Sequence, residues 1–223
     1  MYTTIFLQFA IIHFFYRIIN LIVTPKARYF VLHALFNFWV VYRVLPDTII
    51  TFTTFSTNMK SINDSAKDTI IGVMIFHVHH LLVSWKDLIL SDKLHHIISA
   101  FITPLIAFLM PERIVATSNF FMCGLPGGID YLLLTMEKYN LISTITEKRI
   151  NCFLNLCLRL PGQFICSTFL IIHLINSNLF FENIFFYYII IFGMCLHTIN
   201  SIYYADLVVR NYEQKKILLN KNI

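Results

Sequence analysis

Apolar runs of about the length of a membrane-spanning helix recur along nearly the whole chain, and they restrict its fold more than any other feature. Seven can be drawn, at 3–23, 29–45, 68–85, 94–110, 114–134, 150–175 and 180–209. Most reach or approach the roughly 20 residues that a helix needs to cross a bilayer. Because lipid cannot satisfy an exposed backbone, such runs predict helices. We therefore expect an all-α integral membrane protein, a bundle of about seven transmembrane helices.

Composition supports this class and argues against two others. The chain has 223 residues, of which 57% are hydrophobic and 13% charged, whereas soluble domains carry about 25% charged residues. The net charge of +5 comes mostly from residues between the apolar runs, so we expect topology signals and no nucleic-acid partner. The five cysteines lie within apolar runs without CxxC spacing. This pattern predicts packed thiols, and neither disulfides nor a metal site.

The distribution of Lys and Arg predicts an orientation in the membrane. With seven crossings, one side holds Lys26, Arg28, Lys86, Lys93, Lys138, Lys148, Arg149, Arg210, Lys215, Lys216 and Lys221. The opposite side holds only Lys60, Lys67 and Arg113. The positive-inside rule then predicts a lumenal N-terminus and a cytosolic C-terminus. The long loop 46–67 would be lumenal, and it contains the sequon Asn63-Asp64-Ser65, whose glycosylation the sequence leaves open.

The chain predicts one main domain with a helix before it and a tail after it. Residues 1–24 lack a basic n-region and a small-x-small cleavage site, so they predict a retained transmembrane helix and not a signal peptide. No linker or repeat interrupts 25–210, and 211–223 form a short basic cytosolic tail.

Histidines gather around the third and fourth runs. His77, His80 and Asp87 share one helix face by their spacing. His95 and His96 begin the fourth run and diverge by about 100° on a helix, so we expect only one of them to face the interior. Ionisable groups inside a membrane usually mark a functional path. The structural alternative is an interfacial helix end whose histidines bond neighbouring carbonyls.

Further polar residues fall in the last three runs. Asp130 follows a predicted helix break at 124–128, where it would cap the resumed helix or partner a histidine. Asn151, Asn155 and Arg159 form a stripe at i, i+4 and i+8, and Asn200 lies on the last run. Counted inward, these groups share the cytosolic half of the membrane. We expect a polar chamber above an apolar well, which suits a lipid.

The order of these motifs resembles the TLC-domain family, which includes ceramide synthases and the TRAM proteins. The resemblance rests on Lys86-Asp87, His95-His96, Asp130-Tyr131-Leu132-Leu133 and Glu137-Lys138-Tyr139-Asn140, and it covers about 25–210. It implies a TLC-like fold in the endoplasmic reticulum. It also implies His95, His96 and Asp130 as catalytic candidates. The expected substrate-binding residues are His77, His80, Asp87, Tyr131, Asn155, Arg159 and Asn200.

The expected function is the handling of a membrane lipid, and two versions stay open. In one, the chamber binds, senses or escorts a lipid. In the other, the chain is an acyl-CoA-dependent N-acyltransferase in which His95 or His96 is the base and Asp130 orients it, with acyl-CoA as substrate and no cofactor. Pro126-Gly127 stands where the family has its first His-Asp, which favours the non-catalytic version. The sequence does not determine whether the chain forms a homo-oligomer.

Two alternatives come from other classes. His77-Val78-His79-His80 suggests a histidine-box lipid desaturase or hydroxylase, although such iron sites use more histidines than the five that lie close together in this sequence. The predicted break in the fifth run would also fit a channel or transporter, but no second broken run forms the paired repeat of such folds.

Overall fold

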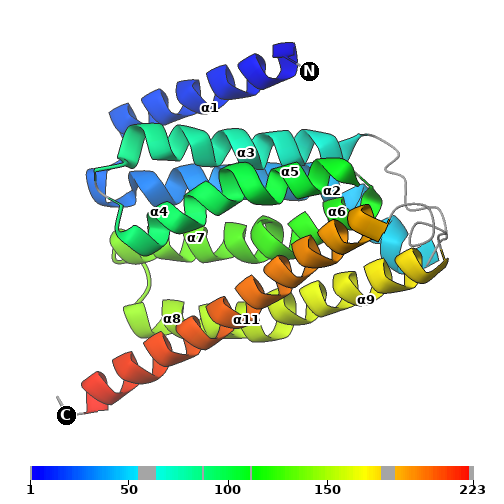
Figure 1. The fold of residues 1–223 in the computed structure, drawn as a ribbon. Helices are drawn as coiled ribbons and strands as arrows, with labels where there is room; N and C mark the ends of the chain where they lie inside the picture. Colours follow the sequence, from blue (N-terminus) through cyan, green and yellow to red (C-terminus); the bar gives the residue numbers. More distant parts are fainter. Residues whose placement is uncertain (1, 55–63, 87, 111, 177–183, 221–223) are drawn as a thin grey trace.

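The computed structural model describes residues 2–54, 64–86, 88–110, 112–176 and 184–220, and almost all of them are helical (Figure 1). The α-helices are α1 (Tyr2–Ile22), α2 (Pro25–Thr54), α3 (Ser65–Ser84), α4 (Leu90–Ile97), α5 (Thr103–Leu109), α6 (Arg113–Asn119), α7 (Leu125–Lys138), α8 (Thr144–Leu154), α9 (Leu160–Asn176) and α11 (Ile184–Asn220). Three π-helical turns, η1 (Ile98–Ile102), η2 (Phe120–Gly124) and η3 (Asn155–Arg159), join α4 to α5, α6 to α7 and α8 to α9. The expected all-α fold is confirmed.

Within the part of the chain that the structure describes, six helical stretches are long and apolar enough to cross a membrane. They are Thr3–Ile22, Pro25–Thr54, Ser65–Ser84, Asp92–Leu109, Thr144–Asn176 and Ile184–Asn220. The run α6–η2–α7 is not among them, although it is continuously helical and carries Asn119 and Asp130 in its interior. A seventh crossing through this run therefore stays a prediction.

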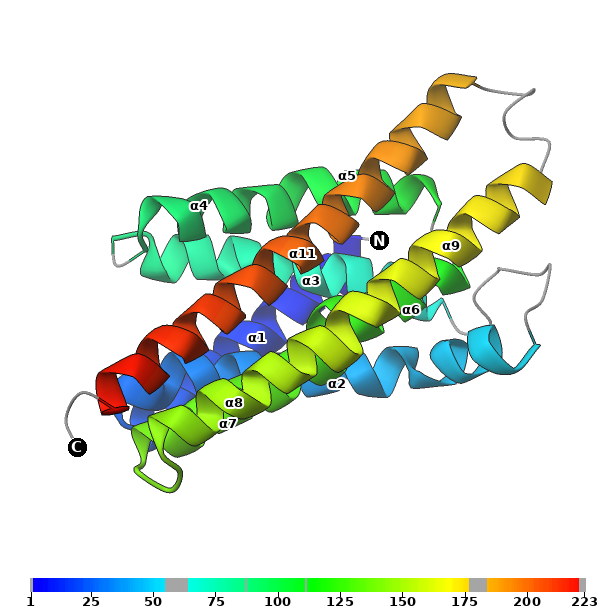
Figure 2. The same cartoon turned by 90° about the horizontal axis from the view of Figure 1, so that it is seen from below.

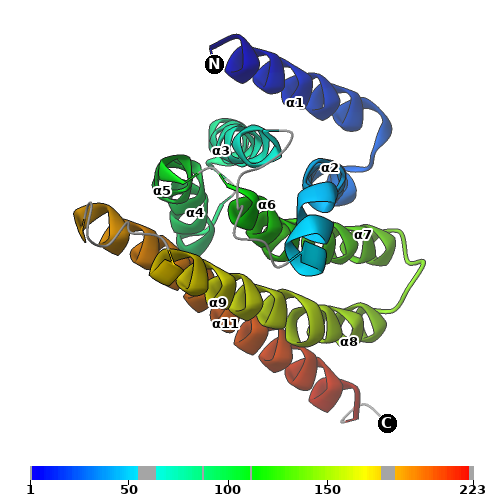
Figure 3. The same ribbon diagram turned by 90° about the vertical axis from the view of Figure 1, so that its right-hand side faces the viewer.

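Successive helical runs alternate in direction (Figure 1). The N-terminus and the C-terminus consequently lie at opposite ends of the bundle. Figure 3 shows α1 at one edge of the bundle, where it contacts α2 and α3. At the opposite edge, α11 runs along α8 and α9, which is clearest in Figure 2. Between these edges α2 packs against α6 and α7.

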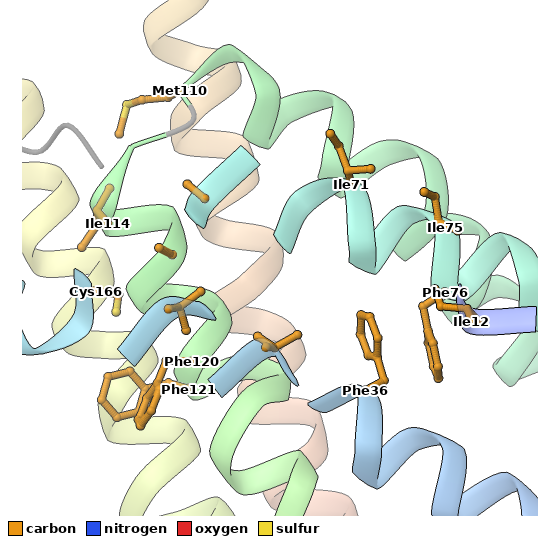
Figure 4. Packing of buried hydrophobic residues seen from close by; sticks show 14 of the residues in the cluster. Ile12, Phe36, Ile71, Ile75, Phe76, Met110, Ile114, Phe120, Phe121 and Cys166 are labelled. Carbon is orange, nitrogen blue, oxygen red and sulfur yellow. The ribbon is translucent and has the colours of Figure 1, made fainter. Parts of the chain in front are cut away.

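The apolar core extends between α2, α3, α6 and α9 (Figure 4). Phe36 and Phe76 stack with ring centroids 4.1 Å apart. Further along, Phe120 and Phe121 of η2 pack edge to face at 5.1 Å. Met110, Ile114 and Cys166 complete this end of the core.

Each π-turn ends two residues before a proline. The prolines are Pro104, Pro126 and Pro161. A proline donates no hydrogen bond and its ring collides with the carbonyl four residues back, and a π-turn accommodates that collision by widening the helix.

These π-turns correct two expectations. The chain remains helical through 124–128, so the predicted break is only a widened turn. Asp130 consequently lies in the second turn of α7 and is not its N-cap, which is Gly124. The predicted loop start at 46 is also wrong, because α2 continues through Pro46 to Thr54.

A buried polar network ties α2, α3 and α6 together at the end of the bundle remote from the basic loops. Arg113 Nε lies 3.2 Å from Asp47 Oδ1, with side chains only 5% and 3% exposed. The Ser65 hydroxyl donates to the same carboxylate. Thr51 and Thr117 share a hydrogen bond of 3.0 Å beside this pair. Because its groups are buried and bonded to one another, the network fixes how the three helices meet.

Candidate functional site

Five histidine rings from three helices meet in the half of the bundle near the basic loops. They are His33 of α2, His77 and His80 of α3, and His95 and His96 of α4. His80 is central, with its ring centroid 4.9 Å from that of His33 and 4.8 Å from that of His96. His77 lies 5.2 Å from His96 on the other side. We call these five residues the histidine cluster.

Tyrosines from three helices surround the histidine cluster. The ring of Tyr29 lies 4.0 Å from that of His33, centroid to centroid. Tyr131 of α7 lies 4.6 Å from His33. Tyr204 of α11 lies 5.9 Å from His95. Helices α7 and α11 thus close the cluster on the sides that α2, α3 and α4 leave open.

Backbone carbonyls set the tautomers of two histidines. The Nδ1 atom of His33 lies 2.8 Å from the carbonyl oxygen of Tyr29, and that of His77 lies 2.7 Å from that of Val73. A carbonyl only accepts, so each Nδ1 carries the proton and each neutral ring keeps Nε2 as an acceptor. The structural interpretation of histidines bonded to neighbouring carbonyls therefore holds for these two residues.

His80 and His96 lack such partners. His80 is 3% exposed, and neither of its ring nitrogens has a hydrogen-bond partner among the described residues. His96 is 4% exposed, and its Nδ1 is equally without one there. A neutral imidazole always carries one N–H and one lone pair. Leaving such a group unsatisfied costs about 1–3 kcal/mol, so a water or a ligand group that bonded these nitrogens would be stabilised.

Arg159 adds an incompletely paired cation on the side of α8 and α9. Its Nη1 donates to Asn155 Oδ1 at 2.6 Å, and the guanidinium lies 5.8 Å from the Tyr204 ring centroid. Its Nε is buried without a partner in the described part of the chain, which also gives it no ion pair with a carboxylate. Gly127 lies beside this residue: a Cβ on it would lie 3.7 Å from Nη2, an ordinary contact, and only 2.8 Å from Asn37 Nδ2.

Asp130 lies toward Arg159 and not toward the histidines. Its charged neighbours are Arg159, Glu147 and Lys148, and its Oδ1 is buried with no hydrogen-bond partner among the residues described. No contact described in the structure joins it to His95 or His96. The physical reason is its place beside Tyr131. Neighbouring residues diverge by about 100° on a helix, and it is Tyr131 that faces the histidine cluster.

The remaining predicted residues are spread more widely. Asn155 accepts from Arg159 and donates to the Asn151 carbonyl at 2.9 Å, so the predicted stripe forms one hydrogen-bonded chain. Asn200 contacts the Met122 sulfur at 3.4 Å, one turn of α11 from Tyr204. Asp87 lies outside the described residues.

Sequence reasoning missed Tyr29, His33 and Tyr204. Tyr29, His33 and the buried Asn37 are spaced i, i+4 and i+8, the same signal that identified the stripe ending at Arg159. Tyr204 gave no such signal in a chain with 11 tyrosines.

Two further observations bear on function. Within the described ranges, no group of three or more His, Cys, Asp or Glu side chains is placed to hold a metal ion. Comparison with protein-family models, with curated proteins and with solved structures finds no match to this chain.

Proposed function

We propose that this chain is a lipid-handling protein of the endoplasmic reticulum membrane, of the TLC type, and that the histidine cluster binds the polar head of its lipid. The observation that carries the proposal is His80. It is buried at the centre of the cluster, and both of its ring nitrogens lack partners among the described residues. Native proteins rarely leave buried polar groups unsatisfied, and ligand sites combine apolar walls with a few such groups.

The chemistry around His80 indicates the kind of head group. The Nε2 atoms of His33 and His77 are acceptors and suit a hydroxyl or an amine. Arg159 lies on the far side of Tyr204, and its Nε–H has no acceptor among the described residues. A guanidinium pairs best with a phosphate or carboxylate. A lipid head that carries both an anionic group and a hydroxyl or amine would satisfy both sides.

Lipid binding without chemistry is the better-supported version. An acyltransferase would need His95 or His96 oriented as a base, and among the described residues Asp130 makes no contact with either. Acyl transfer from acyl-CoA to an amine therefore stays the second candidate. The acyltransferase candidate predicts that the purified chain consumes acyl-CoA and forms an amide, whereas the lipid-binding version predicts no reaction.

We expect His80→Phe to reduce the lipid retained by the purified chain about tenfold, since losing about 1.4 kcal/mol of binding energy has that effect. Phenylalanine keeps the ring packing and removes both nitrogens. Native mass spectrometry of the full chain released from detergent measures the retained lipid. His79→Phe is the matched control. His79 is equally buried but faces His13 of α1 across 3.3 Å. If both variants retain lipid as the wild type does, the cluster is not the site.

The proposed orientation gives a separate expectation. The two termini lie at opposite ends of the bundle, so one of them must be cytosolic, and the basic loops favour the C-terminus. In intact microsomes, external protease should digest a tag fused after residue 223 and spare one fused before residue 1. Protection of the C-terminal tag would show that the chain has the opposite orientation, with its C-terminus in the lumen.

A further inference from the structure

A pocket of about 80 Å3 lies between α5, α6, α9 and α11. Its apolar wall includes Ile106, Met110, Ile114, Leu170, Ile190 and Met194. Two of these, Met110 and Ile114, are shown in Figure 4. Its polar residues include Ser118, Gln163 and His197, and none of the described lining residues is charged. A buried water needs roughly 10–15 Å3, so the pocket has room for more than one water.

A chain of three hydrogen bonds fixes the protons on the polar wall. Gln163 Nε2 donates to the Ser118 carbonyl at 2.7 Å, which can only accept, so the amide oxygen faces the Ser118 hydroxyl. That hydroxyl donates its one proton to Gln163 Oε1 at 2.9 Å. Its oxygen must then accept from His197 Nδ1, 3.1 Å away. Neutral His197 is therefore protonated on Nδ1, and its Nε2 is a bare acceptor.

Nothing described in the structure bonds to that acceptor. His197 lines the pocket, and among the described residues of the other helices only Ser118 forms a hydrogen bond with it. An acceptor in apolar surroundings without a donor is costly. A neutral donor is the matching group. A carboxylate or phosphate would be repelled by the lone pair, and an ammonium would enter a pocket without a carboxylate to pair with.

We propose that this pocket binds the hydroxyl end of a long-chain alcohol, with the hydroxyl donating to His197 Nε2, the first few carbons against the apolar wall and the rest of the alkyl chain in the surrounding lipid. Helices α5, α9 and α11 belong to stretches apolar enough to cross a membrane, so the ligand reaches the pocket from the bilayer. The site is separate from the histidine cluster. His197 and Tyr204 are seven residues apart on α11, about 10 Å along its axis.

Photolabelling tests the proposal. The full chain in nanodiscs is exposed to a diazirine-bearing long-chain alcohol or to its methyl ether, and peptides are mapped by mass spectrometry. The alcohol should label α5, α9 or α11 at the pocket about three- to tenfold more than the ether, the value of one net hydrogen bond. His197→Phe should abolish this difference. Ala107→Leu, which fills the pocket and leaves the hydrogen-bond chain intact, should abolish the labelling itself.

Controls separate this site from the histidine cluster. His13→Phe, on the distant α1, should leave labelling unchanged, and so should His80→Phe. Equal labelling by alcohol and ether would overturn the role of His197. Labelling that survives Ala107→Leu would place the ligand elsewhere and leave the pocket to water. If His197→Phe fails to fold, Ala107→Leu still tests whether the ligand lies in the pocket, and the ether comparison still tests whether its hydroxyl donates a hydrogen bond.

Discussion

Replacing Arg113 with methionine should lower the free energy of unfolding by about 3–5 kcal/mol, the usual cost of removing one partner of a buried ion pair. Asp47, which is 2% exposed, would lose this ion pair. The Ser65 hydroxyl also donates to this carboxylate, but a neutral hydroxyl cannot replace the guanidinium. Reversible unfolding in bicelles by added SDS measures the loss.

Two variants distinguish a buried charge from lost packing. Adding Asp47→Asn to Arg113→Met removes the second charge, and we expect it to restore most of the stability, with a coupling that a double-mutant cycle measures. Arg210→Met breaks the ion pair of Arg210 with Asp206, which is largely exposed on α11. Such pairs contribute little, so this variant should unfold like the wild type. Equal losses for Arg113→Met and the double variant would show that Asp47 is not what destabilises the single variant.

Gly162→Ala should destabilise the bundle although alanine is the better helix former. In α9 alone the change would gain about 0.8–1 kcal/mol of helix propensity. Here the new Cβ would lie 2.2 Å from Phe121 Cδ1 and 2.9 Å from Phe121 Cβ. Phe121 is 9% exposed and belongs to η2, so the two helices must separate. We expect a net loss of about 1–3 kcal/mol, as for other overpacked cores, in the same SDS titration.

Gly128→Ala is the matched control. Its Cβ would meet the Phe38 ring at 3.1 Å, and Phe38 is 37% exposed and free to turn outward. Steric cost and helix propensity should then nearly cancel. Phe121→Ala should relieve part of the steric cost of Gly162→Ala in a double-mutant cycle, because it removes Cδ1 and Cγ, the two atoms in closest contact. A Gly162→Ala protein as stable as the wild type would mean that α9 and η2 lie further apart than described.

The helices were predictable because apolar periodicity and length determine them. The first predicted run, 3–23, agrees with α1 to within a residue at each end. Errors came at helix ends and prolines. The helix expected to stop before Pro46 continues to Thr54, and the helix of the last predicted run, 180–209, continues to Asn220. Local sequence marks a helix end poorly when neighbouring helices stabilise the next turn.

The candidate site was predictable in its residue types and less so in its pairings. His77, His80, His95 and His96 were expected near one another, and their rings do adjoin. The expected bond between Asp130 and a histidine depended on which way Asp130 points on α7. The η2 turn before it sets that direction, because an extra residue in a helical turn rotates all that follows. Sequence alone does not determine such a rotation.

Helix α11 is much longer than a bilayer is thick, so a change in its tilt would move its C-terminal end further than the residues near its middle. Its 37 residues extend about 55 Å, while the hydrocarbon core of a bilayer is about 30 Å thick. Its last buried residue is Val208, and the turns from there to Asn220, in which Tyr212 and Lys215 are still half-buried, extend about 18 Å further along the helix axis. His197 of the pocket and Tyr204 beside the histidine cluster both lie on this helix. If ligand binding at either site tilted α11 slightly, its C-terminal end would therefore move further than the residues at the site. A fluorophore at the C-terminal end would report occupancy as a change in distance to the basic loops.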